Sequence, residues 1–323
     1  MHDPSPSLRP LTTRLAPSPT GALHLGNART FLITWALARA SGWRIVLRIE
    51  DLDTPRVKPE TIADTIDTLA WLGMDWDDGP IIQSAELARF IDAMRCLAAR
   101  GLAYPSPHTR GELEAGASLS APQEGVNEPV FPREWRPAPG PRHFDVSQGE
   151  NWRLALPDDS SVTFHDLFCG PITRDVARSV GDFVIWTKRG HPAYQLAVVV
   201  DDDAQGVTHV VRGDDLLDSA ARQLLLMRAL GIAREPEYAH VPLVRGEDGR
   251  RLAKRHGDTR VRAYRSRGVR PQRVVGLVAW WCGITPDRRE MDAQEFRDRL
   301  DLGTIPRDAV TFTREDDAWL CGT

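Results

Sequence analysis

The sequence lacks the segments that would carry the chain into or across a membrane. It has no run of about 18 consecutive apolar residues, which is close to the length that a membrane-spanning helix needs, although 41% of its residues are hydrophobic. Its start is polar and rich in proline, without the apolar stretch of a secretory signal. We therefore expect a cytoplasmic, monomeric protein of two or three domains with no membrane partner.

Cysteine is scarce as well. Four cysteines occur in 323 residues, and no two of them form a Cys-X-X-Cys pair. This pattern predicts neither a disulfide framework nor a zinc ribbon. We expect reduced thiols that mostly serve as packing residues, namely Cys96, Cys169, Cys282 and Cys321.

An overall excess of positive charge is also missing. The net charge of −4 usually counts against a nucleic-acid partner. Between Arg245 and Arg273, however, eleven basic residues occur against three acidic ones, a local excess of eight. Such a cluster is either a face that grips phosphates or an ordinary solvated helix face. Its position beside the lysine loop described below favours the first interpretation.

The first hundred residues alternate between strand-like and helical patterns. Short apolar runs predict strands at 12–16 and 44–49, and amphipathic periodicity predicts helices at 23–40, 59–73 and 85–100. The apolar positions Leu23, Phe31, Leu32, Trp35 and Leu37 form the stripe of the first helix. This alternation favours an α/β layer with a parallel sheet that binds a nucleotide.

Proline interrupts that pattern. Eight prolines fall between residues 105 and 141, which predicts an irregular segment at a domain boundary or insertion. Strands are expected again at 152–156, 161–167, 182–187 and 207–211, and a helix at 215–230. The apolar run 194–200 is interpreted as a further buried strand that ends at Asp201, Asp202 and Asp203. These acids either orient basic residues or only terminate that strand.

The remaining sequence contains a turn and then helices. Asp248 and Gly249 predict a tight hairpin that presents Lys254 just after a strand. From about residue 260 to the end the pattern is helical, with Trp280 and Trp281 expected in the core rather than on a base-stacking surface.

The most informative segment runs from Arg14 to Asn27. A strand enters a Pro-X-Pro turn, and a helix follows whose first amides and positive dipole end could receive phosphate oxygens. His24 could donate to the same oxygens, and Gly26 leaves room for a flat base against the backbone. A distant mobile cation, Lys254, could neutralise a leaving pyrophosphate.

These segments resemble the two signatures of the class I aminoacyl-tRNA synthetases. His24-Leu25-Gly26-Asn27 is similar to the first signature, and the loop around Lys254 is similar to the second. The flanking segments at 14–21, 47–53 and 206–213 resemble the glutamyl branch of that family. The resemblance covers most of residues 12–265.

The resemblance implies a Rossmann-like catalytic domain that is interrupted by an inserted acceptor-binding-type domain and followed by a short helical region. We expect the first catalytic half at 1–103, the insertion at 104–180, the second half at 181–242, and the lysine loop with the helical region at 243–323. Only 68 residues follow Arg255, which is too few for the anticodon-binding portion of the full-length glutamyl enzymes.

The resemblance also implies site residues. Arg14 and Arg212 would grip the carboxylates of glutamate, Glu50 its ammonium group, and Tyr194 would donate a phenolic hydrogen bond. All four lie at or near expected strand ends, where side chains gather at the edge of a parallel sheet. Two smaller residues, Ala16 and Ser18, would line that pocket. ATP would contact His24, Gly26, Asn27 and Lys254, with Mg2+ held mainly by phosphate oxygens and water.

The second signature departs from its common form, because Arg251, Ala253 and Arg255 replace a lysine, a serine and a serine. Arginine preserves charge, and a lost hydroxyl removes a hydrogen bond of about 1 kcal/mol. We expect activity to be retained.

The short chain resembles a truncated subgroup of the glutamyl branch. This resemblance implies activation of glutamate without tRNA and transfer to the queuosine base in the anticodon loop of tRNA(Asp). Two alternatives stay open, an enzyme that charges the 3′ end of a tRNA and an inactive RNA-binding paralogue. The retention of His24, Lys254, Arg14 and Arg212 counts against the second alternative.

Members of that subgroup often hold zinc in the insertion through two cysteines, a tyrosine and a third cysteine. The matching positions here are Ser106, His108, Phe131 and Trp135. Three of these are poor zinc ligands, so zinc is predicted to be absent.

Overall fold

The computed structural model describes residues 10–52, 57–108, 130–250, 252 and 258–322. Contacts between residues divide the chain into two units. The first unit contains Met1–Ser84, Val207–Asp215 and Pro236–Thr323, and the second contains Ala85–Gly206 and Leu216–Glu235. The first unit is therefore assembled from stretches of chain that lie far apart in the sequence.

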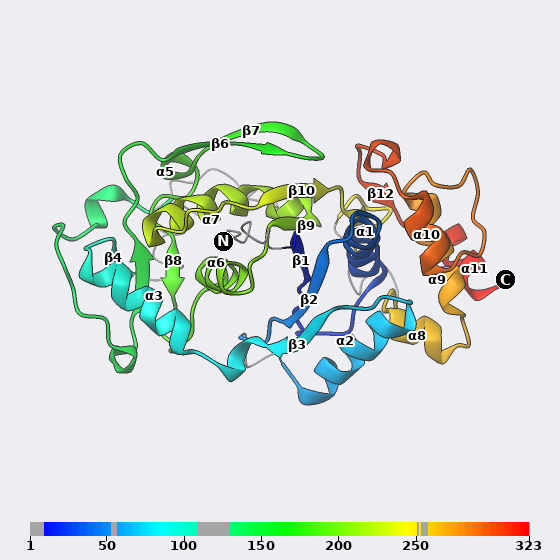
Figure 1. Cartoon of the computed structure of the whole chain (residues 1–323), viewed down its shortest axis with the longest axis horizontal. Coiled ribbons are helices and arrows are strands. Elements are labelled where there is room, and N and C mark those ends of the chain that lie inside the picture. The colour runs from blue at the N-terminus through cyan, green and yellow to red at the C-terminus, as the bar shows by residue number, and fades with distance from the viewer. Residues whose placement is uncertain (1–9, 53–56, 109–129, 251, 253–257, 323) are drawn as a thin grey trace, which may run out of the picture. The chain divides into compact units, whose positions relative to one another are not determined.

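Parallel strands form the centre of the first unit. They are β1 (Thr12–Leu15), β2 (Arg44–Ile49), β3 (Asp78–Ile82), β9 (His209–Gly213) and β10 (Glu237–Val241). β2 pairs with both β1 and β3, and β9 pairs with β10, in each case in parallel. β9 lies beside β1, where the amide of Thr208 donates to the carbonyl of Thr12 over 2.8 Å (Figure 1). The strands expected at 12–16 and 44–49 are confirmed, and the one expected at 207–211 begins two residues later.

Two helices of the first unit follow β1 and β2 directly. They are α1 (Leu25–Ser41) and α2 (Pro59–Trp71). α1 begins after His24, which caps it, and ends at Gly42, whose φ of 68° is in the left-handed region that glycine adopts readily. Leu32 and Trp35 are buried as the stripe predicts, but Ile33 and Thr34 on other faces are buried as well. α1 is therefore enclosed on more than one side.

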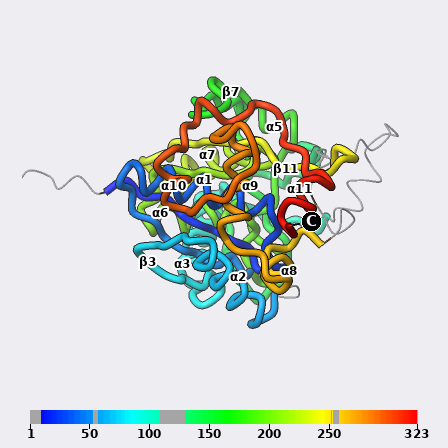
Figure 2. The backbone as a smooth tube through the Cα atoms, turned by 90° about the vertical axis from the view of Figure 1, so that its right-hand side faces the viewer, coloured from blue at the N-terminus to red at the C-terminus, as the bar shows by residue number. Residues whose placement is uncertain are grey.

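The rest of the first unit packs near α1 (Figure 2). Its elements are β11 (Val244–Arg245), α8 (Val261–Ser266), α9 (Pro271–Trp281), α10 (Ala293–Arg299), β12 (Val310–Thr311) and α11 (Arg314–Cys321). The turn predicted at Asp248 and Gly249 is present, because the amide of Gly246 donates to the carbonyl of Arg250 over 2.9 Å and Gly249 has a φ of 73°. Trp281 is in the core, edge-on to Phe312, whereas Trp280 lies under the guanidinium of Arg288 at 4.0 Å.

The described part of the second unit contains two small antiparallel arrangements of strands and four helices, of which α5 is a single turn. Strands β4 (Ala103–Ser106), β5 (Asn151–Leu154) and β8 (Val184–Trp186) form one sheet, and β6 (Ser161–Asp166) with β7 (Gly170–Asp175) forms a hairpin. The helices are α3 (Ala88–Ala99), α5 (Val176–Ser179), α6 (Tyr194–Ala204) and α7 (Leu217–Leu230). Short 3-10 turns occur in both units at Gln83–Ala85, Arg133–Trp135, Val146–Gln148, Asp214–Leu216 and Leu302–Thr304.

The interpretation of 194–200 as a buried strand is wrong. This run is the first part of α6, in which Leu196, Val198 and Val199 are all buried. A helix that is buried on every side has no polar face, so its sequence shows the same unbroken apolar run as a central strand. Tyr194 is therefore the first residue of a helix and does not lie at a strand end.

The four cysteines are unpaired, in agreement with the expectation, but only Cys282 is a buried packing residue. Cys96 and Cys169 are exposed and Cys321 is half-buried.

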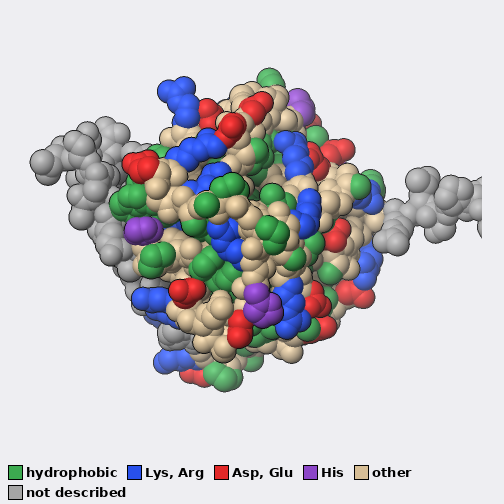
Figure 3. Space-filling model, turned by 90° about the vertical axis from the view of Figure 1, so that its left-hand side faces the viewer, with side chains coloured by type: hydrophobic (Ala, Val, Ile, Leu, Met, Phe, Trp, Pro, Cys, Tyr) green, Lys and Arg blue, Asp and Glu red, His purple; other side chains and the backbone are tan. Residues whose placement is uncertain are grey.

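Basic side chains lie interspersed with acidic and hydrophobic ones on the face drawn in Figure 3. None of the helices among the described residues combines the length and the apolar character that a membrane span requires.

Candidate active site

The carboxyl ends of β1, β2 and β9 bring several of the expected glutamate-binding residues to one edge of the first unit. The amide of Glu50, just after β2, donates to the carbonyl of Pro17 over 3.0 Å, which places Glu50 beside the turn that holds Ala16 and Ser18. Arg14 Nη1 donates to the carbonyl of Val211 over 3.4 Å, which ties β1 to the strand of Arg212. Arg14 and Arg212 are buried, Ala16 is half-buried and Ser18 is exposed.

Glu50 is held by an ion pair inside the protein. Arg48 donates to Glu50 Oε1 from Nε over 3.3 Å and from Nη2 over 3.1 Å, and the Arg48 side chain is fully buried. The next residue, Asp51, accepts from the amide of Ser84 over 2.8 Å and from its hydroxyl over 2.5 Å. The segment after β2 is therefore fixed on both sides and is no loose surface cluster.

Arg212 is oriented by two aromatic residues of β10. Its Nε donates to Nε2 of His240 over 2.9 Å, and its guanidinium carbon lies 5.3 Å from the centre of the Tyr238 ring. Because His240 Nε2 accepts this hydrogen bond, the proton of the neutral ring is on Nδ1. These contacts fix the direction of a planar, permanently charged fork, which suits bidentate binding of a carboxylate.

His24 is the N-cap of α1. Its Nδ1 accepts from the amide of Asn27 over 3.3 Å, and the side-chain oxygen of Asn27 accepts from the His24 amide over 3.2 Å. This reciprocal capping box leaves the proton of the neutral imidazole on Nε2. A β-carbon on Gly26 would come within 3.1 Å of the His24 ring, so the close approach of that ring depends on the glycine.

The expectation of free amides at the start of α1 is largely wrong. Besides the amides of His24 and Asn27 in the capping box, the amide of Leu25 donates to the carbonyl of Thr259 over 3.0 Å. Three of the first four amides are thus bonded within the protein, because a capping side chain and a neighbouring strand satisfy the groups that a helix start otherwise leaves open. Phosphate would have to be met chiefly by side chains.

The described residues that flank the lysine loop lie against the histidine turn. Arg260 forms an antiparallel bridge with His24, and the amide of Val261 donates to the carbonyl of Leu23 over 2.8 Å. On the other flank, the amide of Leu252 donates to the carbonyl of Val244 over 3.3 Å. Arg251, Ala253, Lys254 and Arg255 lie outside the described residues. No sequence motif indicated the contacts of Thr259 and Arg260, because they are made by the main chain.

Known proteins agree with this arrangement. A family model described as tRNA synthetases class I (E and Q), catalytic domain, matches residues 10–315. The chain belongs to this family. Glutamyl-Q tRNA(Asp) synthetase of Symbiobacterium thermophilum is 43% identical over 97% of this chain and 99% of the relative. The protein of the same name from Rhodopirellula baltica is 44% identical over 91% of this chain and 94% of the relative.

Among solved structures, a glutamate tRNA ligase from Elizabethkingia meningosepticum in complex with its amino acid aligns with a TM-score of 0.76 at 26% identity. The alignment covers 97% of this chain and 69% of the ligase. The expected mixed α/β fold of a class I synthetase catalytic domain is thereby confirmed, and the chain is an aminoacyl-tRNA synthetase-like ligase. Enzymes of this class use ATP, generally with Mg2+.

Not every residue that this synthetase was expected to use lies in the first unit. Tyr194 belongs to the second unit, where it opens α6 and is 40% exposed. In the same helix Asp201 is fully buried and accepts from Arg89 Nε of α3 over 2.6 Å. Asp201 therefore orients a basic residue, the first of the two roles left open, and the three acids end no strand because they lie in α6.

Among the described residues, several arginines of the synthetase's basic cluster form ion pairs with carboxylates. The carboxylates come from α2, α11 and nearby loops. These ion pairs are partly exposed to water, so each contributes little to stability. The pairs are Arg260–Asp258, Arg262–Asp64, Arg265–Asp67, Arg267–Asp317 and Arg270–Glu290. The local excess of eight charges in the sequence thus overstates the positive charge of this surface, and the interpretation as a solvated helix face gains support.

The four positions matched to a zinc site come together in the second unit, but as an aromatic cluster. The His108 ring stacks on Trp135 with 4.2 Å between centroids, and Phe131 is edge-on to Trp135 at 5.8 Å. Ser106 accepts from Nε of Arg153 over 3.2 Å, and the same guanidinium lies 4.1 Å from the Phe131 ring centre. Phenylalanine and tryptophan offer no lone pair to a metal, so these residues do not fit a zinc ion.

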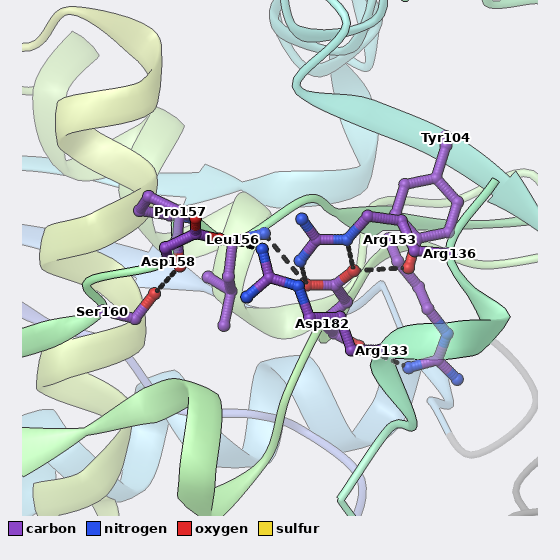
Figure 4. Close-up of polar contacts among 9 residues, drawn as sticks. All are labelled: Tyr104, Arg133, Arg136, Arg153, Leu156, Pro157, Asp158, Ser160 and Asp182. Carbon is purple, nitrogen blue, oxygen red and sulfur yellow. Dashed lines mark hydrogen bonds and ion pairs between the residues drawn. The ribbon is translucent and has the colours of Figure 1, made fainter. Parts of the chain in front are cut away.

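A buried carboxylate ties this cluster to the adjoining strands (Figure 4). Asp182 accepts from the Tyr104 hydroxyl over 2.6 Å, from Nε of Arg136 over 2.7 Å and from the amide of Leu156 over 2.9 Å. Its own carbonyl accepts from Arg153 Nη1 over 2.7 Å. Burial, together with the hydrogen bond to Asp182, raises the pKa of Tyr104, which therefore stays a donor over the whole physiological range.

Proposed function

We propose that this synthetase activates L-glutamate with ATP and then transfers the glutamyl group to the queuosine base of tRNA(Asp). The observation that carries this proposal is the set of main-chain hydrogen bonds and the β-bridge that join residues 259–261 to the histidine turn at 23–25. Lys254 stands two residues after Leu252 and four before Asp258, and both of these flanks are anchored in the same unit as His24. These anchored flanks support a common site for the two signatures.

In the first step the carboxylate oxygen of glutamate attacks the α-phosphorus of ATP, a new P–O bond forms, and the bond to the bridging oxygen breaks to release pyrophosphate. No nucleophile from the protein is needed, so catalysis consists of positioning and charge neutralisation. We assign His24 Nε2 as a donor to the phosphates and Lys254 as the cation for the leaving pyrophosphate. Mg2+ would shield the polyphosphate, with ligands mainly from ATP and water.

Glutamate would lie at the sheet edge. There we assign Arg14 and Arg212 to its carboxylates and Glu50 to its ammonium group, with Ala16 and Ser18 beside it and Tyr194 as a phenolic donor. The ion pair with the buried Arg48 fixes the direction of the Glu50 carboxylate, which supports this role. Gly26 and Asn27 would shape the ATP site through their effect on His24 rather than through free amides.

The choice of acceptor follows from the two curated relatives, both of which are called glutamyl-Q tRNA(Asp) synthetase and are covered almost end to end. Transfer of labelled glutamate to tRNA(Asp) with and without queuosine tests it. We expect labelling only of the modified tRNA. Equal labelling of both forms, or labelling of the 3′ end of tRNA(Glu), would contradict the proposal.

Lys254 can be tested directly because the chain has only three lysines, Lys58, Lys188 and Lys254. We expect ATP to protect Lys254 from an amine-reactive reagent, measured by peptide mass spectrometry, while Lys58 and Lys188 serve as internal controls. Lys254→Ala should strongly reduce glutamate-dependent exchange of pyrophosphate into ATP with unchanged thermal unfolding. Unchanged exchange would remove Lys254 from the mechanism.

We also propose that residues 104–180 form an insertion between two catalytic halves, and that it folds without zinc. The first proposal is supported by the absence of residues 85–206 from the first unit. The second is supported by the aromatic cluster and the Asp182 network, which link the chain on both sides of residues 109–129.

A further inference from the structure

Arg29 of α1 is a buried arginine that pairs with no carboxylate in the part of the chain that the structure describes. It is 1% exposed, and its Nη1 donates to the carbonyl of Pro242 over 2.5 Å. Among the described residues, its Nε and Nη2 find no hydrogen-bond partner. A guanidinium remains charged at every physiological pH, so its burial with only one acceptor is costly.

The environment of Arg29 offers little compensation for that cost. Cys282 lies beside it at the end of α9, and burial raises the pKa of this thiol although the neighbouring guanidinium opposes the shift. A neutral thiol is a weak acceptor. Replacing a poorly compensated buried charge by an apolar side chain of similar volume is often neutral or stabilising. Stability alone therefore gives no reason for an arginine at this position.

The acceptor of Arg29 is the start of the lysine loop. Pro242 is followed by Leu243, whose carbonyl accepts from the amide of Val310 over 3.1 Å, and by Val244, whose carbonyl accepts from the amide of Leu252 over 3.3 Å. Lys254 comes two residues after Leu252. The hydrogen bond from Arg29 is thus the first of a series of contacts that ends at Leu252, the last described residue before Lys254.

Helix α1 carries both Arg29 and the histidine of the first signature. His24 caps α1, and Arg29 lies five residues further along it. A β-carbon on Gly26 would lie 3.6 Å from Cβ of Val244, which shows how closely β11 approaches the first turn of α1. A shift of Pro242 would therefore move Val244 and Leu252 relative to His24.

We propose that Arg29 is a positioning residue, which holds the start of the lysine loop on α1 so that Lys254 and His24 reach the same triphosphate. The proposal rests on the proposed function, because it assigns Arg29 to the activation of glutamate. Arg29 itself touches neither substrate nor the reacting atoms in this role.

The test is a double-mutant cycle between Arg29→Met and Lys254→Ala, read by glutamate-dependent pyrophosphate exchange and by thermal unfolding of the full chain. We expect Arg29→Met to lower kcat by about 10- to 100-fold, the effect of losing one charged hydrogen bond, with a Tm that is unchanged or higher. In the Lys254→Ala background the same change should alter the residual exchange by no more than about twofold, because residues that act through one another are not additive.

Arg39→Met is the matched control. Arg39 is on the same helix but pairs with Asp75 and Asp77 through contacts of 2.9 and 2.8 Å. We expect this variant to lower Tm slightly and to leave kcat and KM for ATP unchanged. A loss of activity equal to that of Arg29→Met would show that any change in α1 disturbs catalysis, and would overturn the proposal.

Three further results distinguish the possible failures. Wild-type kcat in Arg29→Met, or equal losses in the presence and absence of Lys254, would overturn the role of Arg29 while leaving the proposed function intact. No glutamate-dependent exchange by the wild-type chain would instead refute the proposed function. If Arg29→Met does not fold, the cycle is repeated with Arg29→Lys, which keeps the charge and one donor, and additive losses there overturn the proposal in the same way.

Discussion

Replacing Asp182 by alanine should destabilise the second unit far more than any surface change near it. The Asp182 side chain is 3% exposed and accepts hydrogen bonds from Tyr104, Arg136 and the amide of Leu156. Removing one member of a buried ion pair costs about 3–5 kcal/mol, because the partner charge stays buried without compensation. Since two neutral donors lose their acceptor as well, we expect Asp182→Ala to reach the upper part of that range.

Urea unfolding followed by tryptophan fluorescence measures this effect, because Trp135 and Trp152 lie in the same unit. Asp158→Ala is the control, since Asp158 also pairs with an arginine, Arg133, but its side chain is 86% exposed. An exposed pair contributes about 0–1 kcal/mol. Asp182→Asn should fall between the two variants, because the amide keeps an oxygen acceptor but loses the charge. Similar urea midpoints for Asp182→Ala and Asp158→Ala would refute the view that the hydrogen bonds of this carboxylate hold the second unit together.

Three more predictions concern metal, the histidine turn and pH. Incubation with a strong chelator should leave the Tm unchanged, and metal analysis of the purified protein should find no stoichiometric zinc; a fall in Tm that zinc reverses would contradict the metal-free insertion. Gly26→Ala should reduce pyrophosphate exchange about tenfold by displacing the His24 ring, which a β-carbon would approach to 3.1 Å, while alanine stabilises the helix by up to about 1 kcal/mol; wild-type exchange would show that the ring position is irrelevant. Burial alone would raise the pKa of Asp75 and of Asp77, but hydrogen bonds from Arg39 and from neighbouring donors outweigh it and hold both below the ordinary value of 3.8. The stabilisation of the fold by Arg39 should therefore be present above pH 3.8 and disappear as the pH falls through the lowered values, so acid titrations of wild type and Arg39→Met should converge, and a constant difference would exclude the ion pairs as its cause.

β1, β2, α1 and α2 could be predicted well because local pattern and tertiary environment agree there, whereas β3 and β10 were not predicted. β2 coincides with the expected range because its six residues, which end just before the polar Glu50, are almost all buried. α6 could not be predicted, since enclosure on every side removes the polar face that distinguishes a helix from a central strand. The error moved Tyr194 from a strand end to the start of a helix in the other unit.

The local charge of a segment is an equally poor guide to its surface. Arg262, Arg265 and Arg267 pair with acids that are distant in the sequence, because Asp64, Asp67 and Asp317 lie beside them once α2 and α11 are in place. The zinc positions show the opposite case. The absence of ligands could be predicted from the residue types alone, but the stacking of His108 on Trp135 and the central position of Asp182 depend on strands that meet only in the fold.

In the candidate site, features carried by side chains could be predicted from the sequence, whereas contacts made by the main chain could not. Residue type and spacing were enough to single out His24, Glu50 and Arg212, because their chemistry is carried by side chains that a motif records. The contacts that join the two signatures are made by carbonyls and amides of Thr259, Val261 and Pro242, which every residue possesses and no motif records. Arg29 is the exception that connects the two classes, since its side chain recognises a main-chain carbonyl. Any residue at position 242 would supply the main-chain carbonyl, whereas position 29 requires a buried cation. The choice of residue at position 29 is therefore constrained by the position of the lysine loop and not by the sequence of that loop.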